Sequence, residues 1–255
     1  MRLEHYALRP DEMQVLLDRL EQDNEAEKRK NRRLAIGIVA AAVSIVIIFP
    51  IVTVFEGIGV IALIILAFGG IMALAVFSSR SQKLQRQQQR IAFLGAVLDE
   101  NALDLHPDAK LRFDLDLRDY DQGAEKLIWS GYSPHGNIKK RYHDRWLRLK
   151  TRLADRSALI IERRSDIKTK KGNIMKRKER LKVKLRPDPK IYDLPAARSA
   201  LQSEIPLLEI RSAGQGEELV WKVRRQDQDL PASDVQIDLR RVYRVLARYP
   251  RRGRR

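Results

Sequence analysis

The sequence of 255 residues contains no cysteine and only four histidines. The absence of cysteine excludes disulfide bonds, a thiol nucleophile and cysteine-ligated zinc. None of the histidines has the spacing of a metal-binding motif. The chain also has no P-loop, dinucleotide-binding glycine fingerprint, GxSxG motif or kinase signature. We therefore expect a protein that is not an enzyme and that holds no metal and no cofactor.

Positive charge is concentrated in one part of the chain. The formal net charge is +17, yet residues 1–33 are balanced, with eight basic and eight acidic side chains. Residues 79–255 carry 42 basic and 24 acidic side chains, so the whole excess lies there. A surface of this kind favours anionic partners, namely lipid headgroups, nucleic acid or an acidic protein face.

Two long runs of the sequence contain no charged residue. The first covers residues 34–55 and the second residues 57–79, and each exceeds the roughly 20 apolar residues that cross a bilayer. Because two such runs in succession are unusual in the core of a soluble domain, they predict a two-helix transmembrane hairpin. Glu56 falls in the turn between the spans, where a ring of chains would place it at the mouth of a pore.

Basic residues flank both runs on the same side, within residues 28–33 and 80–90. The distribution predicts an integral membrane protein with both termini cytoplasmic, and we assign it to the bacterial inner membrane. Residues 1–33 are predicted to be an N-terminal cytoplasmic helix and residues 80–106 a juxtamembrane helix, because apolar side chains recur there at helical spacing. These two extensions either pack into a short stalk or lie separately.

Residues 107–232 show a different pattern, in which apolar and charged residues alternate. LRFDLDLRD, RWLRLKTRLA and KERLKVKLRPD each place leucine or valine on one side and charge on the other, which is typical of half-buried strands. Leu115, Leu149 and Val183 are the predicted core residues of these segments. Several short strands separated by turns predict a cytoplasmic, antiparallel β-rich domain, either a sandwich or a small barrel. Residues 233–255 are predicted to form a C-terminal helix and a basic tail.

The densest basic segment covers residues 168–186, where ten basic side chains accompany Glu179 as the single acid. The sequence around Lys171 and Gly172 indicates a turn, so the segment is predicted to be a basic hairpin. Its basic side chains either contact an anionic partner or form a solvated edge that resists aggregation. The predicted contact residues are Lys168, Lys170, Lys171, Lys176, Arg177, Lys178 and Arg180.

Three functions fit these features. The preferred one is a non-enzymatic, membrane-anchored interaction or assembly protein that presents its basic domain to anionic lipid or an acidic protein partner. A second is an oligomeric channel component, since small residues in the spans also allow self-association. A third is an enzyme acting on a membrane or phosphate-bearing substrate, for which a pocket would have to collect Asp114, Asp116, His143 and Lys150. Nucleic acid is the less favoured phosphate donor because no recognisable nucleic-acid-binding motif accompanies the charge.

Overall fold

Two units make up the chain in the computed structural model. The structure describes residues 2–52, 58–98, 105–106, 108–205, 207–213, 216–226, 231 and 233–251. One unit is Leu17–Ile91, and the other combines Met1–Leu16 with Ala92–Arg255.

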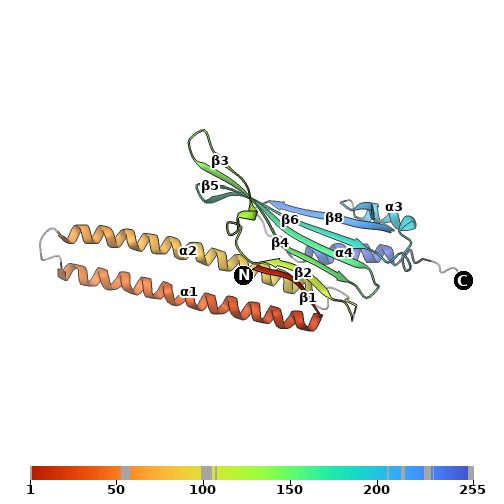
Figure 1. Ribbon diagram of the computed structural model, residues 1–255, viewed down its shortest axis with the longest axis horizontal. Helices are drawn as coiled ribbons and strands as arrows, with labels where there is room; N and C mark the ends of the chain where they lie inside the picture. The colour runs from red at the N-terminus through yellow and green to blue at the C-terminus, as the bar shows by residue number, and fades with distance from the viewer. Residues whose placement is uncertain are drawn as a thin grey trace. The chain divides into compact units, whose positions relative to one another are not determined.

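The unit of residues 17–91 consists of two long helices, α1 (Pro10–Val52) and α2 (Ile58–Leu98), which each extend at one end into the other unit. The helices lie side by side (Figure 1), and the Lys28 ammonium donates a hydrogen bond to the Gln88 side chain across them. The polar extensions of the two apolar runs are therefore helical and adjacent, as the stalk hypothesis requires.

The predicted transmembrane hairpin is wrong. The described residues of each apolar run continue without a break into a charged or polar helical segment, and they belong to helices of 43 and 41 residues. Within the described part of the chain, neither these helices nor any other offers a segment long and apolar enough to cross a membrane. The predictions that depended on the spans, an integral protein of the bacterial inner membrane with cytoplasmic termini, are wrong for the same reason.

The second unit is built on one antiparallel sheet of eight strands in the order β1-β2-β4-β5-β6-β8-β7, with β3 paired to β4 outside this path. Three helical segments accompany it, η1 (Ala124–Lys126), α3 (Leu194–Glu204) and α4 (Ser233–Leu246). The strands are β1 (Arg2–Leu8), β2 (Leu111–Asp116), β3 (Leu127–Tyr132), β4 (Ile138–Arg152), β5 (Ala158–Lys170), β6 (Asn173–Arg186), β7 (Glu209–Ala213) and β8 (Gly216–Gln226).

One face of this sheet is buried and the other is in contact with solvent. Leu115, Leu149 and Val183 are at most 1% exposed, which confirms them as core residues. Their cross-strand partners include Leu147 and Trp221, which are also buried. The opposite side chains of β5 and β6 are half-buried or exposed. The alternation of the sequence thus separates a core face from an open face.

The prediction of a sandwich or small barrel is wrong, because the strands of the described residues form a single sheet instead of two packed sheets. β4, β5 and β6 contain 15, 13 and 14 residues and pair with one another over almost their whole length. Buried apolar side chains of α2, α3 and α4 contribute to the core where a second sheet was expected. The predicted N-terminal helix also omitted β1, which pairs with β2.

The sheet ends in a four-stranded arm, defined here as β3 with residues 138–145, 163–170 and 173–180. A bulge between Arg145 and Leu147 marks the point on β4 where β3 replaces β2 as its neighbour. In Figure 1 the arm lies at the end of the sheet far from α3. The β5–β6 turn has positive φ at Lys171 and Gly172, as a tight two-residue hairpin requires. The Lys171 amide donates to the Ile138 carbonyl at 3.0 Å, which links the turn to β4.

Candidate basic interface on the open face of the sheet

The open face displays basic side chains in rows that cross the strands. In an antiparallel sheet, directly paired residues place their side chains on the same face. The observed register therefore defines a surface shared by β4, β5, β6 and β8, which we call the basic face. Its rows, from the arm inward, are Lys139–Lys170–Asn173, Arg141–Lys168–Lys176, His143–Asp166–Lys178–Gln226, Arg145–Arg164–Arg180–Arg224 and Arg148–Glu162–Lys182–Lys222.

One of these rows consists of four arginines. Arg145, Arg164, Arg180 and Arg224 belong to four neighbouring strands and are paired in succession across the sheet. Like charges placed directly opposite one another destabilise a sheet. Of the four, Arg180 makes an ion pair, with Asp166 at 2.7 Å. The arginine row is therefore a feature that the stability of the fold does not account for.

Two carboxylates stand among the basic residues of these rows. Asp166 binds the His143 imidazole at 2.8 Å as well as Arg180, and Glu162 lies 3.3 Å from Arg148. Asp166 and Glu162 partly neutralise the positive charge of the two rows that flank the arginine row. The row of Arg141, Lys168 and Lys176 contains no acid.

The pKa of Lys182 reflects the density of positive charge on the basic face. Partial burial lowers the pKa of its ammonium, and the neighbouring charge of Lys184 lowers it further. Arg211 and Lys222 act in the same direction, whereas Glu162 opposes them. The positive form of Lys182 is thus less favourable here than in water, and a bound anion would reverse this effect.

Five of the predicted contact residues lie on the basic face. They are Lys168, Lys170, Lys176, Lys178 and Arg180. Lys171 is exposed in the β5–β6 turn. Arg177 belongs to the other side of the sheet, since it is paired with the buried Ile167 and binds the buried Glu179 at 2.7 Å. Glu56 lies outside the described residues.

Glu179 belongs to a buried charge cluster on the core face. Its side chain is fully buried and accepts hydrogen bonds from Ser165 at 2.5 Å and Arg177 at 2.7 Å. The Arg163 guanidinium lies 3.5 Å from the same carboxylate. It also lies 4.2 Å from the ring centre of Phe93 and 5.0 Å from that of Trp146. The cluster fixes the strands beneath the arginine row to the last turns of α2.

A second buried cluster holds the segment that precedes the arm. The buried Lys126 ammonium lies 2.9 Å from Asp144 and 3.1 Å from Asp116, and it donates to the carbonyls of Arg118 and Asp119. Burial favours the neutral form of Asp116. The hydrogen bonds from Arg118 and the charge of Lys126 outweigh burial and hold the pKa of Asp116 below its usual value.

Of the residues that an enzyme would have required, Asp114 and Asp116 lie on β2, and His143 and Lys150 lie on β4. His143 and Asp144 point to opposite faces of β4, because His143 is paired with Asp166 on the basic face and Asp144 with the buried Ser165. Asp114 is paired with Arg148, and Asp116 is engaged by Lys126. No cluster of three or more histidine, aspartate or glutamate side chains suited to a metal occurs in the described ranges.

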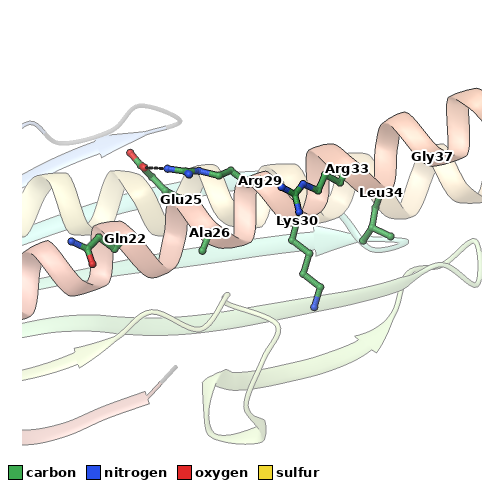
Figure 2. Close-up of a pocket in the computed structure, with 8 residues that line it drawn as sticks. All are labelled: Gln22, Glu25, Ala26, Arg29, Lys30, Arg33, Leu34 and Gly37. Carbon is green, nitrogen blue, oxygen red and sulfur yellow. Dashed lines mark hydrogen bonds and ion pairs between the residues drawn. The ribbon is translucent and has the colours of Figure 1, made fainter.

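A groove of about 940 Å³ lies along α1, in the unit of residues 17–91. Figure 2 shows that its lining side chains all come from this one helix, with Glu25 bound to Arg29 at 3.1 Å. Arg29 and Glu25 are 76% and 64% exposed, so solvent screens their interaction. The groove has no convergent set of reactive groups among these side chains. Its lining residues are Gln22, Glu25, Ala26, Arg29, Lys30, Arg33, Leu34 and Gly37.

The sequence-based prediction missed the contributions of β4 and β8 to the basic face. Arg148 was visible as a charged position of an alternating strand, and Arg224 as one of a basic pair. Arg145 has the parity of the core residues Leu147 and Leu149, and only the bulge between Arg145 and Leu147 places it on the basic face. Their juxtaposition with Arg164 and Arg180 depends on the strand register, which the alternation alone does not specify.

No family model, curated protein or solved structure matches this chain. The function proposed below therefore depends on the geometry and charge of the basic face.

Proposed function

We propose that the protein is a non-enzymatic binding protein whose basic face binds a macromolecular polyanion. The arginine row is the observation that carries this proposal. Four guanidinium groups in succession repel one another in the free protein, and a ligand with closely spaced negative charges would relieve that repulsion. The planar fork of arginine suits both phosphate and carboxylate groups, which it binds with two parallel hydrogen bonds.

The dimensions of the basic face support an extended ligand. Its rows run along β5 from Lys170 to Glu162, a distance of about 27 Å at about 3.4 Å per residue. They run across four strands, or about 14 Å at about 4.8 Å between neighbours. A small anion would engage one row at most, whereas a polyanion would engage several rows at once.

A binding role fits the chemistry better than catalysis does. Arginine remains protonated at neutral pH and so offers no general base. The carboxylates of the face, Asp166 and Glu162, are already bound to basic partners. The side chains of the face therefore supply positive charge and hydrogen-bond donors, which suit the capture and alignment of an anionic chain.

The test is the salt dependence of binding by the full chain. The first probe is an abasic 12-residue oligonucleotide, which presents phosphates without bases, and the second is polyglutamate of matched charge. We expect binding of at least one probe at 50 mM salt. For a contact with four to six phosphates, the logarithm of the affinity should fall with the logarithm of the salt concentration with a slope of about −3 to −4.

Binding of polyglutamate alone would support an acidic protein as the partner class. The absence of binding to both probes at 50 mM salt would overturn the proposed function. Binding that does not change with salt would also overturn it, because exposed charges are screened beyond about 8 Å at physiological ionic strength.

A further inference from the structure

The arm presents an exposed tryptophan at the margin of the basic face. Trp129 on β3 is 46% exposed, whereas Trp146 and Trp221 are at most 2% exposed. Trp129 is paired with Arg141, which continues the row through Lys168 to Lys176. The indole therefore extends a row of three basic side chains on the same face.

Gly131 leaves the space that this indole occupies. A Cβ atom at Gly131 would lie only 2.6 Å from Cζ2 and 3.0 Å from Cη2 of Trp129. The six-membered ring thus lies over the glycine, against the strand. The absence of a side chain at position 131 is what permits this placement, since real Cβ atoms do not approach other atoms so closely.

The positively charged guanidinium of Arg141 lies over the Trp129 ring. Its Cζ atom lies 5.7 Å from the ring centre of Trp129, within the range of a cation–π interaction. An aromatic ring held beside a line of basic groups is the arrangement with which proteins bind single-stranded nucleic acid, where bases stack on the ring and basic groups contact the phosphates.

On the premise of the proposed function, we infer that the polyanion is a single-stranded nucleic acid and that Trp129 stacks on one of its bases. The length of the basic face, about 27 Å, is sufficient for contacts with several phosphates of one strand. An anionic lipid surface fits less well, because a tryptophan that inserts into a bilayer interface has to project from the protein. The Trp129 ring instead lies against its own strand.

The test compares two oligonucleotides that differ only in their bases. A labelled oligothymidine of 12 residues and the abasic 12-mer are titrated with the full chain at 50 mM salt, and binding is followed by fluorescence anisotropy. We expect the oligothymidine to bind more tightly. Trp129→Ala should weaken oligothymidine binding about 5- to 150-fold, the range for one stacked base, and leave abasic binding unchanged.

Two further variants separate stacking from damage to the arm. Gly131→Ala should displace the indole and weaken oligothymidine binding while Trp129 remains present, and Trp129→Phe should recover part of the affinity. Ile128→Ala removes another side chain of β3, which is 61% exposed, and should change neither affinity. Protection of the tryptophan fluorescence from acrylamide by oligothymidine should disappear in Trp129→Ala, because the other two tryptophans are buried.

Equal binding of both oligonucleotides, unchanged by Trp129→Ala, would overturn this inference and leave the proposed function intact. Binding of polyglutamate, or of vesicles of phosphatidylserine and phosphatidylcholine, with no binding of either oligonucleotide would also overturn it. A protein that binds none of these probes would contradict both the inference and the proposed function.

Discussion

Replacing Glu179 by glutamine should lower the free energy of unfolding of the sheet unit by about 3–5 kcal/mol. The carboxylate is fully buried between Arg163 and Arg177, and the Arg163 side chain is only 6% exposed. The variant leaves buried positive charge without its counter-charge. Urea unfolding followed by tryptophan fluorescence reports on this unit, because Trp129, Trp146 and Trp221 all belong to it.

The matched control is Glu204→Gln. Glu204 binds Arg248 at 2.7 Å, but the two side chains are 34% and 56% exposed. Exposed ion pairs contribute about 0–1 kcal/mol, so this change should have a small effect. Equal destabilisation by the two substitutions would mean that the Glu179 cluster does not act as a buried ion-pair network.

Changing Arg145, Arg164, Arg180 and Arg224 together to glutamine should weaken binding of the abasic 12-mer about 100- to 1,000-fold. This range assumes that each exposed charge contact contributes about 0.7–1 kcal/mol. The salt slope should become shallower by about 3, since each lost phosphate contact removes about 0.7. The urea midpoint should stay the same or rise, because the variant removes repulsion between like charges.

A control variant removes the same number of charges from the helices. Arg198 on α3 and Arg240, Arg241 and Arg244 on α4 are changed to glutamine, which gives the same net charge as the variant of the arginine row. If both variants lose affinity equally, net charge governs binding and the arrangement of the arginine row does not.

The sequence predicted the strands well because their pattern is local. The alternation in β2, β4 and β6 identified Leu115, Leu149 and Val183 as core residues before any pairing was known. The number of sheets was not predictable in the same way. It depends on which strands pair and on helices that complete the core, and both are non-local properties.

The membrane prediction shows the limit of counting apolar residues. The length of the uncharged runs, residues 34–55 and 57–79, was treated as sufficient evidence for two transmembrane spans. None of the described helices is long and apolar enough to cross a membrane, which contradicts that prediction. The channel hypothesis required those spans and Glu56 at a pore mouth, so it is not carried forward. The preference for lipid over nucleic acid also depended on a membrane tether, and the inference of a single-stranded nucleic acid instead depends on the geometry of the arm.

The candidate site was predictable in part. The basic segment of residues 168–186 was recognised by its composition, and five of its seven named contact residues lie on the basic face. Arg177 lies on the opposite face, because position 177 alternates with the half-buried position 176 and the exposed position 178. No sequence pattern indicated that Trp129 belongs to the candidate site, because only the register of β3 against β4 places it beside Arg141.

Lysine acetylation of the full chain, with and without the abasic 12-mer, tests the location of binding most directly. Peptide mass spectrometry gives the acetylation rate of each lysine. We expect slower acetylation of Lys139, Lys168, Lys176 and Lys182 on the basic face when the probe is bound. Lys30 on α1, together with Lys110 and Lys190 outside the strands, should react at unchanged rates. Protection of these three lysines with no change on the basic face would contradict the assignment of the binding surface.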